Sequence, residues 1–359
     1  MNRGVVAWMA QMRKLLRHQT SPNLERRAEN AARQARAETA GMPAAEHRFN
    51  RRTLLAAGGL LLGSAAWVAL GLESWAAERQ SPDRPLPFDP RESLRSFELG
   101  RLIEENGRKI RLFEVEAHSI TVPLASGVLF KAWTLNGRIP GPTLRATQGE
   151  RIRVVFRNAD STSHSLHFHG IHPAAMDGIE PVLRGKTAIY EFDLPRAGVY
   201  PYHCHVPPVV RHVGKGLFGL LVVDPPTPRP MADELVLVMG GYDLNNDERN
   251  ELYAFNGIPD TYKHHPIRVK QSALIRIYLL NMTELEPPLT FHVHANEFRV
   301  LRSGPLESTD VVTLGVAERQ ILELSFPYPG IYMFHPHQDQ IAERGCMGHF
   351  DVIAARNDA

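Results

Sequence analysis

The sequence predicts an all-β protein of two tandem Greek-key β-sandwich domains that follow an N-terminal export or anchor segment. Three observations support this. Short runs of β-branched and aromatic residues are separated by Gly, Pro, Asn and Asp, no long stretch after residue 76 has helical periodicity, and the chain contains an internal repeat. Of the 359 residues, 43% are hydrophobic and 22% are charged, which is typical of a packed core and excludes global disorder.

Charge and cysteine content exclude further classes of protein. The 41 Lys and Arg residues almost balance the 39 Asp and Glu residues, so nothing favours nucleic acid or an anionic membrane surface as the main partner. Cys204 and Cys346 are the only cysteines, which excludes a disulfide-stabilised scaffold. The 17 histidines are unusual because ten of them fall in close pairs or triplets.

Residues 1–76 precede the predicted domains and carry a targeting pattern. Arg51-Arg52 stands directly before the apolar stretch Leu54–Leu72, and Ser74-Trp75-Ala76 offers small residues at the two positions that a signal peptidase recognises. The pattern resembles a Tat export signal, which predicts a periplasmic or extracellular protein. An uncleaved membrane anchor is the alternative, because about 20 apolar residues span a bilayer. Met42 would give a shorter and more conventional start than the first methionine.

Proline-rich stretches predict where the domains begin and end. Residues 77–96 contain prolines and acidic residues and predict a linker, and Asp224–Pro230 predicts a stiff connector. We therefore assign the first domain to residues 97–226 and the second to residues 231–356. Within these domains we expect strands at 151–156, 217–223 and 274–280.

The two predicted domains are copies of one unit. Residues 191–205 align with residues 323–337 at a constant offset, with Glu, Pro, Gly, Tyr and two His in common. Similarly, His167-Phe168-His169 matches His292-Val293-His294. An ordered series of matches indicates a duplicated domain, and two packed sheets per copy would bury the apolar faces.

Strand geometry sorts the clustered side chains of the first domain onto two faces. Side chains at positions i and i+2 of a strand point the same way, and the one between them points the opposite way. His203 and His205 therefore share a face, while Cys204 points away from it. His167 and His169 share a face by the same argument, so paired strands would present four imidazoles together.

A second group is expected on the opposite face. His164 has the opposite parity to His167, and His212 follows Cys204 by eight residues. Two imidazoles and one thiolate form the ligand set of a blue, type 1 copper centre. The usual position of a weak axial ligand is Leu217, which cannot coordinate a metal, so the site should be three-coordinate.

The second domain repeats only the imidazole half of this pattern. His292 and His294 pair with His335 and His337, but Pro336 stands where the first domain has its cysteine. The second domain therefore cannot hold a thiolate-bound copper. Four imidazoles from each domain are enough for three further coppers, and the lack of clustered thiolates argues against iron–sulfur centres.

These motifs resemble the multicopper oxidase family. The resemblance is carried by Asn136–Pro142, His164–Gly170, His203-Cys204-His205 with His212, and His335-Pro336-His337, and it covers residues 110–355. The layout is similar to two-domain, laccase-like members with the type 1 copper in the first domain, which are relatives of copper nitrite reductases. It implies two cupredoxin-like domains and four coppers per chain.

The resemblance also implies a role for each ligand. Type 1 copper would be bound by His164, Cys204 and His212, and the single type 2 copper by His167 and His292. The binuclear type 3 pair would be bound by His169, His203, His205, His294, His335 and His337. The replacement of the axial methionine by Leu217 departs from the family and implies a higher reduction potential.

Several residues near the histidines have alternative interpretations. Reduction of dioxygen consumes protons, so we expect one of the carboxylates Asp177, Asp339 and Glu343 to relay them. Asp177-Gly178 is equally a good turn dipeptide. Cys346 aligns with Leu217 and predicts a buried apolar thiol. We expect structural or solvated roles for His18, His47, His118, His264 and His265, and no ligand role for His172 and His349.

The resemblance implies an oxidase that takes single electrons from a donor and reduces dioxygen to water. Each domain offers half of the cluster, so two domains must face each other, and the resemblance to two-domain members implies that they do so in a closed head-to-tail homotrimer with the cluster at subunit interfaces. A monomer that closes its own two domains is the alternative. Phenols, metal ions and small redox proteins all remain open as the donor.

Two other functions compete with the oxidase. A copper nitrite reductase needs only three histidines at its catalytic copper, and that family normally lacks counterparts of His167 and His205, which are present here. A non-catalytic periplasmic cupredoxin-type protein would need only the type 1 ligands.

Overall fold

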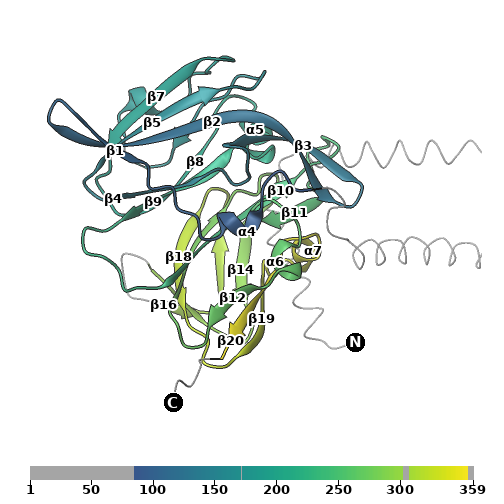
Figure 1. The fold of residues 1–359 in the computed structure, drawn as a ribbon. Helices are drawn as coiled ribbons and strands as arrows, with labels where there is room; N and C mark the ends of the chain where they lie inside the picture. The colour runs from purple at the N-terminus through teal and green to yellow at the C-terminus, as the bar shows by residue number, and fades with distance from the viewer. Residues whose placement is uncertain (1–84, 171, 302–306, 355–359) are drawn as a thin grey trace, which may run out of the picture. The chain divides into compact units, whose positions relative to one another are not determined.

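The computed structural model describes residues 85–170, 172–301 and 307–354. These residues form twenty strands in four sheets, and the longest of the helices among them, α5 (Val209–Gly214), has six residues (Figure 1). The all-β prediction is therefore confirmed. The predictions for residues 1–76 lie outside the described residues. Within the described ranges, no helix has the length and hydrophobicity needed to cross a membrane.

The first sandwich packs two sheets built from residues 101–224. In one sheet the order is β1-β2-β5-β7 with β3 on β2, and in the other it is β4-β9-β8-β6. Its strands are β1 (Arg101–Glu105), β2 (Arg108–Ala125), β3 (Val128–Leu135), β4 (Thr143–Thr147), β5 (Arg151–Asn158), β6 (His167–Phe168), β7 (Thr187–Asp193), β8 (Gly198–His203) and β9 (Phe218–Asp224). The short helices η1 (Ala174–Met176) and α5 lie in its loops.

The second sandwich repeats this architecture. Its sheets have the orders β11-β10-β13-β18-β15-β16 and β12-β20-β19-β14-β17. Its strands are β10 (Asp233–Tyr242), β11 (Leu252–Phe255), β12 (Ile267–Lys270), β13 (Ile275–Asn281), β14 (Leu289–Val293), β15 (Phe298–Val300), β16 (Glu307–Thr309), β17 (Val311–Leu314), β18 (Arg319–Leu324), β19 (Gly330–His335) and β20 (Gly348–Ile353). The helices α6 (Thr261–His264) and α7 (Asp339–Ala342) lie in its loops.

Strand β5 shows how the sequence pattern produces this packing. Ile152, Val154 and Phe156 alternate along it and are fully buried in the core of the first sandwich. The intervening Arg153 points outward, where its Nε lies against the carboxylate of Glu191 on β7. Alternating apolar and charged positions place one face of the strand in the core and the other in solvent.

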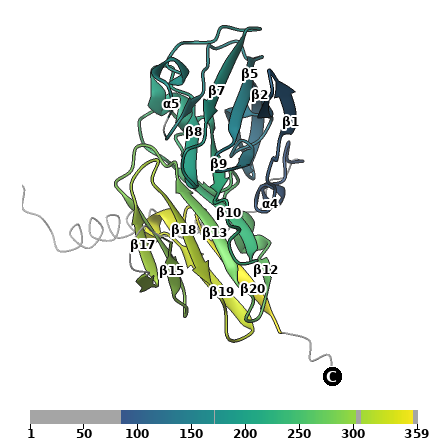
Figure 2. The same cartoon turned by 90° about the vertical axis from the view of Figure 1, so that its left-hand side faces the viewer.

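Strand β10 is buried on both faces because it lies between the two sandwiches. Leu235, Leu237 and Met239 belong to the core of the second sandwich. Val236 and Val238 point the other way, into an apolar cluster that also contains residues of β9. The ribbons of β9 and β10 are labelled at this junction in Figure 2. The two sandwiches therefore share an apolar junction, which explains the uninterrupted hydrophobic run of this strand.

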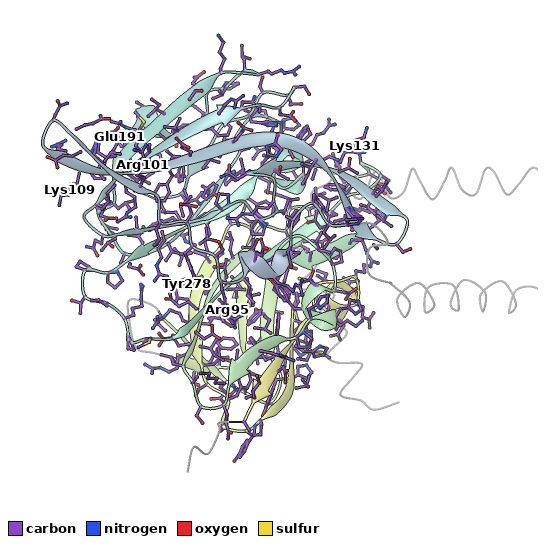
Figure 3. All side chains as sticks on the ribbon, viewed as in Figure 1. Arg95, Arg101, Lys109, Lys131, Glu191 and Tyr278 are labelled. Atoms are coloured by element: carbon purple, nitrogen blue, oxygen red, sulfur yellow. The ribbon has the colours of Figure 1, made fainter. Side chains whose placement is uncertain are left out.

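A charged network closes the edge of this junction. Arg145 on β4 contacts Asp224 at 2.7 Å and Glu234 on β10 at 2.6 Å. Glu234 also accepts a hydrogen bond from the hydroxyl of Tyr278 at 2.7 Å and lies 3.2 Å from Arg276 (Figure 3). These bonds link the two sandwiches through partly buried charges.

Residues 85–96, the second half of the predicted linker, are bound to the second sandwich. The helix α4 (Pro90–Ser93) begins after Asp89, whose side chain accepts a hydrogen bond from the Arg91 backbone N–H. Leu94 is buried in the core of the second sandwich, and Arg95 pairs with Asp233 at 2.8 Å (Figure 3).

Candidate metal centres

The first sandwich brings together the three ligands predicted for type 1 copper. Cys204 directly follows β8, His212 lies on α5, and His164 lies in the loop before β6, where it bridges to Val182. All three side chains are buried. They come from three separate segments, so only the folded sandwich assembles them.

The donor atoms of these residues converge on one point. The Cys204 Sγ lies 3.2 Å from Nδ1 of His212 and 3.9 Å from Nδ1 of His164, and the two Nδ1 atoms are 3.2 Å apart. A point equidistant from the three atoms is about 2.0 Å from each, within the range of about 2.0–2.3 Å that imidazole and thiolate bonds to a first-row metal span. The residues fit a three-coordinate copper without rearrangement of the backbone.

The surroundings keep the two imidazoles neutral and the centre dry. Burial lowers the pKa of His164 and brings the pKa of His212 to about 4, so both rings keep a lone pair at neutral pH. Burial also raises the pKa of the Cys204 thiol, which only a bound cation would reverse. Trp133 packs over both rings, with ring centroids 5.1 Å from His164 and 4.7 Å from His212.

Leu217 lies beside this centre, as its position in the sequence predicts. The side chain is fully buried in the same apolar cluster as Cys204, and its carbonyl oxygen accepts the Cys204 N–H at 3.0 Å. It has no atom that can coordinate a metal, so its buried side chain offers only apolar contact.

The four other histidines of the first sandwich form one cluster, which we call the first quartet. Its members are His167, His169, His203 and His205. His167 on β6 pairs directly with His203 on β8 in the antiparallel register. The Nε2 atoms of His169 and His203 are 3.0 Å apart, and the rings of His203 and His205 stack at 6.0 Å.

The second sandwich forms an equivalent cluster, which we call the second quartet. Its members are His292, His294, His335 and His337. His292 on β14 pairs with His335 on β19 in the same antiparallel register as in the first quartet. The Nε2 atoms of His294 and His335 are 2.9 Å apart. The duplicated sequence thus produces duplicated imidazole geometry.

Backbone carbonyls fix the ring orientation of one pair of histidines in the first quartet. The Nδ1–H of His167 donates to the carbonyl oxygen of Asp177 at 2.7 Å, and that of His203 donates to the Cys204 carbonyl at 2.9 Å. A carbonyl can only accept, so Nδ1 carries the proton and Nε2 keeps a lone pair. Metal-binding histidines usually have this second hydrogen bond.

The second quartet repeats the same two bonds. The Nδ1–H of His292 donates to the Asp310 carbonyl at 2.8 Å, and that of His335 donates to the Pro336 carbonyl at 2.8 Å. Both quartets therefore present bare Nε2 atoms, which is the state that copper requires.

Both quartets are open on one side. His167, His169 and His205 are partly exposed, and His294 and His337 are exposed. Ring contacts join histidines within each quartet, and among the described residues none joins a histidine of one quartet to a histidine of the other.

The three predicted relay carboxylates differ in their position. Asp177 lies beside the first quartet, with Oδ1 3.3 Å from Nδ1 of His167. Asp339 begins α7 and is exposed. Burial lowers the pKa of His335, and the charge of Asp339 opposes this lowering only in part. Glu343 is exposed directly after α7, and within the described ranges it forms no hydrogen bond or ion pair with a quartet histidine.

Three neighbours of the centres were not found from the sequence. Trp133 covers the three-ligand centre, Asp160 Oδ1 lies 3.5 Å from Nε2 of His164, and Asp310 supports His292. Asp310 corresponds in role to Asp177 but follows its histidine at a different spacing, so the repeat alignment did not reveal it.

The remaining histidines within the described ranges lie outside the predicted ligand groups. The Nε2–H of His172 donates to the Phe168 carbonyl oxygen at 2.9 Å, and the same nitrogen lies 4.0 Å from Oδ1 of Asp177. His264 and His265 line a cavity of about 570 Å³, which none of the eleven predicted ligands lines. His18 and His47 lie outside the described residues.

Comparison with known proteins agrees with this geometry. Family models described as multicopper oxidase match residues 116–228 and 229–356. A crystal structure of a multicopper oxidase is 42% identical, with a TM-score of 0.73 over 75% of this chain and 98% of that chain. The copper-containing nitrite reductase of Neisseria gonorrhoeae is 27% identical over 280 residues, 69% of this chain and 70% of that protein.

A solved copper nitrite reductase from Nitrosomonas europaea is also similar. It is 26% identical, with a TM-score of 0.62 over 69% of this chain and 95% of that chain. Together with two cupredoxin-like sandwiches and their histidine clusters, these matches place the chain in the multicopper oxidase family.

Proposed function

We propose that this oxidoreductase takes single electrons from a donor at His164, Cys204 and His212 and reduces dioxygen to water at the two quartets. The observation that carries the proposal is the duplicated set of Nδ1–H bonds to carbonyl oxygens, which leaves bare Nε2 atoms in both quartets. Copper bound at these residues, four ions per chain, would supply the one-electron chemistry and the activation of dioxygen.

The path from the donor side to the quartet side is short. Cys204 lies between His203 and His205 in the chain, with its side chain in the core and theirs in the quartet. A thiolate ligand and two quartet ligands are thus joined through a few covalent bonds. Asp177 supports proton delivery, because it touches His167 and is itself partly exposed to solvent.

The complete cluster would form between neighbouring chains of a homotrimer. Each quartet is open at the surface and supplies four of the eight imidazoles, so a site built from two chains needs a head-to-tail interface that closes by rotation. Export by the twin-arginine signal in residues 1–76, with a membrane anchor as the alternative, is part of the same proposal.

Mixing two inactive variants tests this arrangement. One variant carries His167→Ala and His169→Ala, and the other carries His335→Ala and His337→Ala. In coexpressed trimers the intact quartets meet at some interfaces, so we expect about one quarter of the wild-type oxygen uptake per chain. A protein whose sites form within one chain would show no uptake in the mixture, and that result would refute the shared site.

The similarity to the copper-containing nitrite reductase of Neisseria gonorrhoeae favours nitrite reduction as a second candidate function. Its catalytic copper needs three histidines, whereas this chain keeps His167 and His205 within the first quartet. Metal analysis separates the candidates, since the oxidase requires four coppers per chain and the reductase two. Measurement of oxygen uptake and of nitrite consumption on the same preparation provides the functional comparison, and nitrite consumption with two coppers would refute the oxidase.

A further inference from the structure

A cavity of about 220 Å³ lies at the boundary between the two sandwiches. Its walls come from the start of β8 in the first sandwich and from the start of β18 in the second, and these two strands contact each other. Tyr200 on β8 lines this cavity and also a smaller one that His169 lines. A Cβ atom on Gly170, the neighbour of His169, would lie 3.1 Å from the Tyr200 ring. The cavity therefore adjoins the segment that carries a predicted ligand of the first quartet.

Arg319, the first residue of β18, is the one charged residue among the described residues that line the cavity. Its Nε–H donates to the carbonyl oxygen of Val199 on β8 at 3.0 Å, and its guanidinium lies 5.9 Å from the centre of the Tyr200 ring. The bond to Val199 crosses from one sandwich to the other. Because both contacts hold the guanidinium in place, little conformational entropy is lost when a ligand binds it.

This guanidinium lacks the counter-ion that comparable arginines have. Arg145, Arg151 and Arg153 are also partly buried, and each binds two carboxylates. Among the described residues, no carboxylate pairs with Arg319 and no group accepts a hydrogen bond from its two terminal nitrogens. Glu318, directly before it, accepts a backbone N–H of the preceding turn at 2.9 Å. A partly buried cation without a partner raises the free energy of the fold, and a bound anion would lower it again.

The walls around the guanidinium fit an anion that has an apolar body. The planar fork of a guanidinium matches a carboxylate, which it binds through two parallel hydrogen bonds. Ala197, Leu301, Ile321 and the ring of Tyr200 add apolar surface. A cavity of about 150 Å³ holds benzene, so the larger volume here admits one ring together with its carboxylate.

We propose that this cavity binds a monocarboxylate whose apolar body is the size of a benzene ring, with the carboxylate held by the terminal nitrogens of Arg319. The ligand supplies the negative charge that no described residue places beside this arginine. Its apolar body contacts Tyr200 and Ile321, which line the same cavity. Binding forms no covalent bond and transfers no electron, so the site is independent of the proposed copper chemistry.

The chemistry of the site is tested by calorimetric titration of the copper-loaded full chain with three probes. Benzoate should bind, whereas benzamide, which has the same shape without the charge, should bind at least about tenfold more weakly. Nitrate, which is a planar anion without a ring, should also bind at least about tenfold more weakly, because it buries no apolar surface. Absence of benzoate binding, or binding of benzamide or nitrate as tight as that of benzoate, overturns the proposal.

The position of the site is tested by substitution. Arg319→Gln should weaken benzoate binding at least about tenfold, because a neutral amide replaces the charged fork. Arg299→Gln is the matched control, since Arg299 is exposed on the adjacent strand β15, lies outside the cavity and should not affect benzoate binding. Equal affinity of the wild type and of Arg319→Gln would mean that benzoate binds elsewhere, for example to copper at the quartets, and overturns the assignment of the cavity.

A measurement on the unaltered chain accompanies the substitution, because Arg319→Gln also removes the bond to Val199. Phenylglyoxal modifies accessible arginines, and mass spectrometry of the peptides follows each arginine separately. Benzoate should slow the modification of Arg319 and leave that of Arg299 unchanged. Modification of Arg319 at the same rate with and without benzoate overturns the proposal, whatever the stability of the variant.

Discussion

The Nδ1 atom of His167 lies 2.7 Å from the carbonyl oxygen of Asp177, ten residues further along the chain. This contact depends on the turn after η1, where Gly178 has a φ of 73°. A Cβ atom on Gly178 would collide with the carbonyl oxygen of Leu166. The turn therefore accepts only glycine, and it is the turn that fixes the tautomer of a predicted copper ligand.

Gly178→Ala should disrupt the turn that holds the Asp177 carbonyl against His167, and copper should be released from the first quartet. We expect a loss of stability of about 3 kcal/mol or more, because backbone strain and a collision add. Gly185→Ala is the matched control: its φ of 72° imposes similar strain, but no atom lies near its added Cβ. The control should cost about 1 kcal/mol and keep its copper. Calorimetry and metal analysis measure both effects, and full copper in Gly178→Ala would contradict the argument.

Cys204→Ser should remove the blue absorption and one copper per chain while the fold is kept. The hydroxyl is a poor ligand for the copper held by His164 and His212, and donor oxidation should stop with it. Cys346→Ala removes the other buried thiol, which lies in the core of the second sandwich, and should keep the colour and all coppers. Optical spectra and oxygen uptake provide the measurement, and unchanged turnover in Cys204→Ser would refute electron entry at this centre.

Leu217→Met should lower the reduction potential of the three-ligand centre. A thioether at the position of this buried leucine can act as the weak axial ligand that the site otherwise lacks. The exchange nearly conserves volume, so it should cost less than about 1.5 kcal/mol. Leu221→Met in the same core is the control and should leave the potential unchanged. Redox titration of the blue absorption decides between a lowered and an unaltered potential.

Glu234→Gln should make stability less dependent on acid pH. Burial raises the pKa of Glu234, but hydrogen bonds from Arg145, Tyr278 and Arg276 outweigh this effect and hold the pKa below its ordinary value of 4.5. The depressed pKa means that the stabilisation is present above pH 4.5 and is lost as the pH falls through the folded-state pKa.

At neutral pH this substitution should cost about 2–3 kcal/mol, because it removes the negative charge that pairs with Arg145 and Arg276 and replaces one acceptor oxygen with an NH2 donor. Asp351→Asn breaks a longer and more exposed pair with Arg268 and should change the unfolding temperature little at any pH. Calorimetry from pH 3 to pH 7 compares the stability of the variants. If the stability of wild type and of Glu234→Gln fell in parallel through the acid range, the stabilising role of the ionised Glu234 would be disproved.

Local pattern was sufficient to predict much of the fold. Ile152, Val154 and Phe156 alternate with a second set of residues, three of them arginines, and this pattern specifies a half-buried strand whose faces β5 has. Strand geometry predicted that Cys204 points away from His203 and His205, and the structure places the thiol in the core and the two rings in the quartet, although β8 ends at His203. Such features follow from the chain itself because neighbouring residues of a strand have fixed directions.

The tertiary structure decided what distant segments do to one another. Trp133, Asp160 and Asp310 reach the centres from strands and loops whose spacing carries no motif. The sequence by itself determined which residues can bind metal and which face they share. Long-range packing decides which carbonyls hold these histidines and which aromatic ring covers them, and no local period in the sequence encodes that packing.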